Sequence, residues 1–147
     1  RDIFRRVGMD WLWYGRLKLD DAALTAVLQD PARAFYTLTR DGKDEALLEL
    51  NFPEDGTCEL AYFGLTSALI GSGSGRYLMN QAITLAWEQP ITRLHLHTCT
   101  NDSPQALGFY VRSGFTPVRR QVEIDDDPRL TGLLPRDAAP QVPLIEG

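Results

Sequence analysis

A glycine-rich segment between a strand-like run and a helical run is the most informative chemical feature of this sequence. Gly71, Gly73 and Gly75 alternate with serines, and Arg76 follows them. Glycines have no Cβ atom, so several backbone N–H groups can converge on one anion at the N-terminus of the next helix. Between positions 78 and 86 apolar residues recur at helical spacing. The pattern therefore predicts a diphosphate-binding loop at the start of a helix.

Spacing separates three glycine-rich patterns that bind phosphates. A nucleoside-triphosphate P-loop ends in Gly-Lys followed by Ser or Thr, and this segment contains no Gly-Lys. The dinucleotide fingerprint G-x-G-x-x-G fits Gly71 and Gly73 but meets Arg76 where its third glycine belongs. The third pattern, Q/R-x-x-G-x-G/A, fits Gly73 and Gly75, with Ile70 in place of the usual Gln or Arg.

Through this third pattern the sequence resembles the GNAT superfamily of acyl-CoA-dependent N-acyltransferases. Residues 59–65 resemble the fourth strand of that fold, and the run 59–80 resembles its histone-acetylating branch without a gap. Residues 103–110, followed by Gly114-Phe115, resemble the family segment N-x-x-A-x-x-x-Y-x-x-x-G-F. The resemblance covers roughly residues 45–121, and three ordered segments at compatible separations make it specific.

The resemblance implies acetyl-CoA as a co-substrate and no metal. Backbone groups of Phe63 and Leu65 would pair with the pantetheine amides like an added strand, and one N–H would polarise the thioester carbonyl. Ile70 offers no polar side chain to the loop, and Ser103 replaces the usual Asn, for which Asn101 is a candidate substitute. The residues implied for cofactor binding are Phe63, Gly64, Leu65, Gly71, Ser72, Gly73, Ser74, Gly75, Arg76, Ser103, Ala106 and Tyr110.

Two residues are candidates for catalytic proton transfer. An alkylamine with a pKa near ~10 is about one part in a thousand neutral at pH 7, so a base must take its proton, typically for a ~10²–10⁴-fold gain. Glu59 matches the catalytic glutamate of the histone-acetylating branch, and strand alternation predicts that it shares a face with Phe63. Glu49 is the alternative base. Tyr110 matches the family's tyrosine near the CoA sulfur, where it would protonate the leaving thiolate. A solvated strand carboxylate and a packed core tyrosine are the structural alternatives.

Aromatic residues and one arginine near the N-terminus are candidates for the acceptor side. Trp11, Trp13 and Tyr14 precede Arg16, and such a group suits a substrate with an apolar body and a carboxylate. We predict that Trp13 and Arg16 contact the substrate. Core packing is the alternative role for at least one tryptophan.

The run His95-Leu96-His97-Thr98-Cys99 raises a zinc hypothesis, because alternation on a strand points residues 95, 97 and 99 the same way. A fourth ligand is not evident, so the sequence favours interior histidines and no metal. His97 is predicted to serve as an auxiliary base or an acceptor contact.

Capping residues, turns and periodicity predict one α/β (α+β) domain. Its mixed, mostly antiparallel sheet is flanked by helices and splayed between the strands at 58–65 and 93–99. The first expected elements are a capped helix at 20–28 and two strands at 34–39 and 45–52, joined around Asp41-Gly42. The strand at 58–65, the helix that ends near Glu88 and the strand at 93–99 follow. A short helix with Ser103 as N-cap, Pro104 inside and Gly114 beyond it comes next, and a closing strand or strand pair is expected at 115–124.

Composition bounds the organisation of the chain. We assign residues 1–125 to the domain and 126–147 to a proline-rich irregular tail that packs on it or extends from it. The sequence begins with Arg, so the family's first strand is expected to precede it. A net charge of −5 argues against a basic nucleic-acid surface. No apolar run approaches the ~18 residues that span a membrane, no signal peptide is evident, and two cysteines cannot build a disulfide framework, so a cytoplasmic location is expected.

The sequence thus predicts an N-acetyltransferase that moves an acetyl group from acetyl-CoA to a primary amine by direct attack in a ternary complex. A small-molecule acceptor is expected, with no nucleic acid and no membrane as partner, and a homodimer stays open. Direct attack is preferred over a Cys99 acyl-enzyme because the resemblance supplies a base and an acid without a nucleophile. The alternatives are a non-catalytic acyl-CoA-binding or regulatory domain and an acetyltransferase that modifies protein lysines or N-termini.

Overall fold

The computed structural model describes residues 1–146 and is organised around a four-stranded mixed sheet. Its strands follow the order β1 (Arg33–Tyr36), β4 (Ala46–Asn51), β5 (Thr57–Leu65) and β6 (Arg93–Leu96). The first two pairings are antiparallel and the third is parallel, so the predicted mostly antiparallel sheet is confirmed. A separate two-stranded hairpin contains β2 (Thr39–Arg40) and β3 (Lys43–Asp44).

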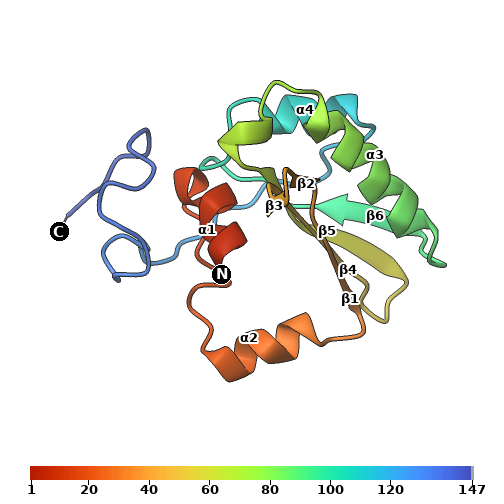
Figure 1. The fold of residues 1–147 in the computed structure, drawn as a ribbon, viewed down its shortest axis with the longest axis horizontal. Coiled ribbons are helices and arrows are strands. Elements are labelled where there is room, and N and C mark those ends of the chain that lie inside the picture. The colour runs from red at the N-terminus through yellow and green to blue at the C-terminus, as the bar shows by residue number, and fades with distance from the viewer. Residues whose placement is uncertain (147) are drawn as a thin grey trace.

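Helices lie on both sides of this sheet (Figure 1). They are α1 (Asp2–Gly8), α2 (Asp21–Leu28), α3 (Ser74–Trp87) and α4 (Ala106–Arg112), with short 3-10 turns η1 (Met9–Trp11) and η2 (Ser67–Leu69). The capped helix α2 begins as predicted, because Asp20 Oδ1 accepts the N–H of Ala23 at 2.7 Å. Helix α3 opens directly after the glycine segment, also as predicted.

The turn between β2 and β3 is the junction expected at Asp41-Gly42. Both residues have positive φ, 52° and 76°. Two consecutive left-handed residues make the hairpin turn whose twist matches the flanking strands, and Asp-Gly is a favoured pair for it. Local chemistry therefore determines this connection.

One face of the sheet is apolar and packs under α3. Its fully buried residues come from β4 and β5 on one side and from α3 on the other, and α4 adds the half-buried Phe109 and Tyr110. The buried set is Ala46, Leu48, Leu50, Cys58, Leu60, Leu78, Met79, Ala82 and Ala86. Burial of this surface is the main apolar contribution to the stability of the fold.

A β-bulge in β5 changes which residues share a face. Leu50 pairs with Leu60 and Glu49 with Tyr62, so the register shifts and Ala61 is the extra residue. Glu59 consequently lies on the face opposite α3, whereas Phe63 packs into the apolar core. The predicted shared face of Glu59 and Phe63 is wrong, because simple alternation does not hold across a bulge.

Strands β5 and β6 separate beyond their first four residues. Pairing runs from Thr57 opposite Arg93 to Leu60 opposite Leu96, and β5 then continues alone on this side to Leu65. The predicted splay is thus confirmed, but β6 ends three residues before the predicted Cys99. Asp102 Oδ2 accepts the backbone N–H of Cys99 at 3.0 Å and the Thr98 hydroxyl at 2.8 Å, so its side chain holds these residues in a turn instead.

Two further predictions of local structure fail. Helix α4 begins at Ala106 after Gln105, not after Ser103, because Ser103 instead closes a turn in which its carbonyl accepts the N–H of Ala106 at 2.8 Å. Gly114 does follow the helix, with φ 102°. No strand forms over 115–124, where Val118, Val122 and Ile124 are about nine-tenths exposed. A strand needs a neighbouring strand and a surface to cover, and this segment has found neither within the described residues.

The residues after 124 pack against the N-terminal region on the α1 side (Figure 1). Leu134, Ala138 and Ala139 surround Leu12, and Tyr14 donates a hydrogen bond to Asp125. Inside this tail Arg129 is buried, donating to Asp127 and to the carbonyl oxygens of residues 138, 142 and 143. Across residues 1–146, none of the helices has the length and apolar character that a membrane crossing needs.

Candidate active site

A row of polar side chains crosses the face of the sheet opposite α3. Arg33, Asn51, Glu59 and His95 stand directly opposite one another on β1, β4, β5 and β6. Sequence analysis missed Arg33 and Asn51, although the alternation of Leu48 and Leu50 with polar neighbours would have indicated a polar face. We refer to this surface, together with Glu49 and Tyr62 beside the row, as the polar face.

Glu59 and His97 are in direct contact on the polar face. His97 Nδ1 lies 3.1 Å from Glu59 Oε1, and Asn51 Nδ2 approaches the other carboxylate oxygen at 3.5 Å. The Glu59 side chain is 28% exposed, whereas that of His97 is 71% exposed. The interior position expected for both histidines is therefore wrong for His97. It holds for the half-buried His95, whose Nδ1 lies 2.9 Å from the Cys58 carbonyl oxygen and whose pKa is lowered by desolvation.

Glu49 is buried on the polar face and held by two arginines. Arg16 Nη2 donates to one carboxylate oxygen at 2.5 Å, and Arg33 Nη1 donates to the same oxygen at 2.6 Å. The Arg16 guanidinium also lies over the Tyr62 ring, 4.9 Å from its centroid. These contacts fasten the segment between η1 and α2 to the sheet. Arg16 is thus engaged with a protein carboxylate.

Trp13 occupies a packed aromatic cluster. Its ring centroid lies 5.6 Å from that of Phe4 and 5.1 Å from that of Tyr62. A Cβ on Gly64 would come within 3.1 Å of the Trp13 ring, so the glycine permits this close approach. The geometry supports core packing for Trp13, with any substrate contact limited to its exposed edge.

The start of α3 presents a set of backbone donors, of which the Ser74 N–H already donates to the Ser72 hydroxyl oxygen at 3.4 Å. Gly71 and Gly73 have φ of 78° and 85°, and Gly73 is the N-cap residue without a side-chain capping bond. The first N–H groups of a helix have no intrahelical partner, and the helix dipole adds positive potential there. A Cβ built on Gly71 or Gly73 meets no atom within 4 Å, so the space in front of these donors is open. Arg76 is exposed beside them. This donor set fits the diphosphate of a CoA-type ligand.

Glu45 fixes the segment that leads from β5 to the glycines. Its Oε2 accepts the Thr66 hydroxyl at 2.5 Å, and its carbonyl oxygen accepts the Thr66 N–H at 3.0 Å. The Thr66 hydroxyl bond is the main cause that lowers the pKa of Glu45. Arg6 Nη1 adds a contact at 3.1 Å. The carboxylate is therefore held ionised and keeps Thr66 in place.

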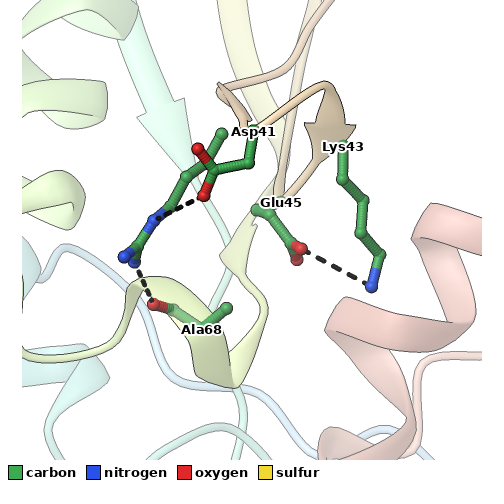
Figure 2. A pocket seen from close by; sticks show the side chains of 5 residues that line it. Asp41, Lys43, Glu45 and Ala68 are labelled. Carbon is green, nitrogen blue, oxygen red and sulfur yellow. Dashed lines mark hydrogen bonds and ion pairs between the residues drawn. The ribbon is translucent and has the colours of Figure 1, made fainter.

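An open hollow of about 490 Å³ adjoins this junction (Figure 2). Figure 2 shows the ion pair between Lys43 and Glu45, whose charged atoms are 3.6 Å apart. Arg40 donates to the Ala68 carbonyl oxygen at 3.2 Å. The charged side chains around the hollow thus pair with one another or with the backbone. The contact between Arg40 and Ala68 holds η2 against the hairpin. None of the candidate catalytic residues lines the hollow.

Tyr110 projects from α4 into the apolar side of the splay. Its ring centroid lies 6.4 Å from Phe63, 5.8 Å from Phe109 and 6.2 Å from Phe115. Burial raises the pKa of this phenol, so it stays protonated at neutral pH. Both the packed role and a proton-donating role are consistent with this position.

The remaining residues predicted to bind the cofactor through β5 and α4 lie on the apolar side of the sheet. The side chains of Phe63 and Leu65 pack toward α3 and α4, while Ser103 and Ala106 lie at the start of α4. The buried Cys58 has its pKa raised to about 11 by desolvation, so its thiol is not poised as a nucleophile. Within residues 1–146 there is no group of three or more His, Cys, Asp or Glu side chains suited to a metal ion.

Known proteins resemble this chain in sequence and in fold. Over 70 residues the chain is 39% identical to mycothiol acetyltransferase from Jonesia denitrificans, which is 48% of this chain but only 22% of that protein. The fold resembles a transcriptional regulator from Bacillus halodurans, with a TM-score of 0.62, 20% identity, and 71% and 73% of the two chains covered. It also resembles an aminoglycoside N-acetyltransferase in complex with CoA, with a TM-score of 0.60, 12% identity, and coverage of 71% and 84%.

The sequence model of the acetyltransferase (GNAT) family matches residues 5–115, which is most of the chain and includes every strand of the sheet as well as α3 and α4. The chain belongs to the acetyltransferase (GNAT) family.

Proposed function

We propose that this chain is an N-acetyltransferase that moves an acetyl group from acetyl-CoA to a primary amine of a small molecule, by direct attack in a ternary complex. The observation that carries the proposal is the division of the splay into two chemically different sides. Backbone donors at the start of α3 and the half-buried phenol of Tyr110 lie on the apolar side, and the Glu59–His97 pair lies on the polar face.

On the apolar side, the residues suit a cofactor that carries phosphates and a long amide-bearing arm. Acetyl-CoA, when bound, supplies an acetyl group activated as a thioester. The N–H groups from Ser74 to Arg76 would receive the diphosphate, with Arg76 as a fixed positive charge. Residues 63–65, which lie in the part of β5 that β6 leaves unpaired, would bond to the pantetheine amides. Tyr110 would give its proton to the leaving sulfur.

On the polar face, Glu59 and His97 are the groups that would remove a proton from the ammonium form of the acceptor. A carboxylate and an imidazole both have pKa values below that of an alkylammonium, and the enzyme needs only a small steady fraction of neutral amine. Most of the rate gain would come from positioning, which contributes on the order of 7–11 kcal/mol in well-aligned reactions. Through Glu49, Arg16 holds the segment between η1 and α2 beside the polar face.

Relatives named for mycothiol and for aminoglycosides support a small molecule over a protein as the acceptor.

Calorimetry with CoA, followed by release of free thiol from acetyl-CoA in the presence of an amine panel, tests the proposal. The panel contains aminoglycosides, polyamines, amino-sugar thiols and lysine peptides. We expect CoA to bind and at least one small amine to release thiol above the hydrolysis rate. Binding without thiol release from any amine would identify a non-catalytic CoA-binding domain. Release with peptides alone would identify a protein acetyltransferase, and absence of CoA binding by folded protein would overturn the whole assignment.

A further inference from the structure

We propose that His97 Nε2, and not the Glu59 carboxylate, takes the proton from the attacking amine, and that Glu59 is the positioning residue that orients the His97 ring. This inference rests on the proposed function and names which member of the pair touches the substrate. It differs from the sequence-based expectation, in which Glu59 is the base and His97 an auxiliary.

The first support is the contact between the two side chains. His97 Nδ1 lies 3.1 Å from Glu59 Oε1. A carboxylate is an acceptor only, so this distance requires the proton on Nδ1. The neutral ring then keeps its lone pair on Nε2. An imidazole fixed in one tautomer by a carboxylate is the arrangement that makes histidine an efficient general base.

The second support is that Glu59 is already occupied by protein groups. Its Oε1 faces His97 and its Oε2 faces the Asn51 amide at 3.5 Å. The carboxylate is 28% exposed, while the imidazole in front of it is 71% exposed. An amine that approaches from solvent therefore reaches the imidazole before the carboxylate.

The third support is the location of His97 in the sheet. Leu60 and Leu96 are the last paired residues of β5 and β6, and His97 follows immediately. It stands where the two strands part, which is the point at which the polar face and the apolar side of the splay meet. Tyr110 contacts Phe63 on the other side of β5. A base and an acid thus flank the position where the acyl group would lie.

The step balances with these groups. The amine nitrogen bonds to the acetyl carbon as Nε2 takes one N–H proton, the carbon–sulfur bond breaks, and the sulfur takes the Tyr110 proton. The exposed imidazolium then loses its proton to water, and the phenolate regains one from water. The titratable and charged groups that face His97 are Glu59 from β5 and His95 from β6, whose ring centroid is 6.1 Å away, with Arg33 further along the row.

Two variants separate the roles through the pH dependence of kcat. We expect His97→Gln to lower kcat on the order of 10²-fold and to abolish the acidic limb of the pH profile. We expect Glu59→Gln to lower kcat about tenfold, to keep that limb and to move it to lower pH, because loss of the carboxylate removes its stabilisation of the imidazolium. His95→Gln is the matched control and should keep the limb in place.

The opposite pattern would overturn the inference: Glu59→Gln losing 10²-fold or more while His97→Gln retains both kcat and the limb. Nitrogen-15 NMR of the His97 ring gives a readout without activity. The protonated nitrogen should be Nδ1 in the native chain, and Glu59→Gln should shift the ring toward the other tautomer. An Nε2-protonated ring in the native chain contradicts the inference even where the transfer reaction itself is confirmed. A native chain that binds CoA but transfers nothing contradicts the proposed function instead. His97→Asn is a second variant should His97→Gln fold poorly.

Discussion

The two faces of the sheet differ in what they contribute to folding. Leu48 and Glu49 are neighbours on β4, and both are buried, yet Leu48 packs under α3 while Glu49 lies on the polar face. Burial of the leucine removes apolar surface from water and stabilises the fold. Burial of the glutamate costs desolvation that only two arginines offset. The buried charges at Glu49 thus hold side chains in fixed positions at a desolvation cost that burial of a leucine does not carry.

The largest expected effect comes from removal of the buried carboxylate. Glu49→Ala removes the carboxylate that Arg16 and Arg33 share and leaves only Asp30, 3.4 Å from Arg33, as a counter-ion, so the free energy of unfolding should fall by about 3–5 kcal/mol. Urea denaturation, monitored by tryptophan fluorescence, measures this free energy of unfolding. The matched change on the other face, Leu48→Ala, should cost about 2–5 kcal/mol through lost burial and a cavity.

A compensated variant distinguishes the two mechanisms. Glu49→Leu combined with Arg16→Met and Arg33→Met should regain most of the stability lost in Glu49→Ala, since well-packed apolar groups replace buried ion pairs at little cost. No comparable compensation should be available for Leu48→Ala. A triple variant as unstable as Glu49→Ala would show that the polar face is stabilised by its charges, contrary to the comparison drawn here.

The next effect concerns the acid on the apolar side. Tyr110→Phe removes the phenolic proton but keeps the ring packing against Phe63, so kcat should fall on the order of 10²-fold with the affinity for CoA unchanged. Thiol-release kinetics and CoA calorimetry measure the two quantities. Because the pKa of Tyr110 is raised, no alkaline loss of kcat from its ionisation is expected up to pH ~10. Equal losses in kcat and stability would assign Tyr110 to packing alone.

A smaller effect is expected at the start of α3. Gly73→Ala forces a Cβ into the left-handed region at φ 85°, which costs about 1–2 kcal/mol. Distortion of the donors should also weaken CoA binding, by about tenfold if the strain is relieved locally. Gly56→Ala is the control, because Gly56 has a similar φ of 74° and open space but lies in the turn before β5. The two variants should lose similar stability, and only Gly73→Ala should lose CoA affinity.

The smallest effect is a pH-dependent loosening of the tail. The hydrogen bond from Tyr14 lowers the pKa of Asp125, and the same contact raises the pKa of Tyr14 to about 12. A carboxyl whose folded pKa lies below its unfolded value of about 3.9 stabilises the folded state above that pH, and the contribution is lost as the pH falls through the folded value. The protection of the amides in residues 125–142, corrected for the pH dependence of intrinsic exchange, should therefore fall below pH ~4, and Tyr14→Phe should abolish most of this dependence. Equal protection at pH 3 and pH 6 would contradict it.

Features set by residues close together in the sequence were predictable. Asp20 caps α2, Asp41-Gly42 turns the hairpin, and the alternating glycines open α3, each through backbone conformations that those residue types favour locally. The ends of β6 and α4 were missed for a similar local reason, since the side chains of Asp102 and Ser103 bind neighbouring backbone and compete with regular structure.

The candidate site was only partly predictable. Glu59, His97 and Tyr110 were named from the sequence, but their relations were not. The bulge at Ala61 turns Glu59 away from Phe63, and pairing of β5 with β6 then brings Glu59 to His97 from 38 positions away. Glu49 binds Arg16 from 33 positions away in the sequence and Arg33 from 16 positions away. No local sequence pattern contains such contacts.

The sequence by itself determined the order of the elements from α2 to α4, the donor-rich start of α3 and the apolar stripe that packs beneath it, because hydrophobic periodicity and turn chemistry act over a few residues. Only the tertiary structure decided which polar side chains face one another, because strand register and one inserted residue fix the direction of every side chain on the sheet. The relation between Glu59 and His97, from which the proposed chemistry follows, belongs to that second level.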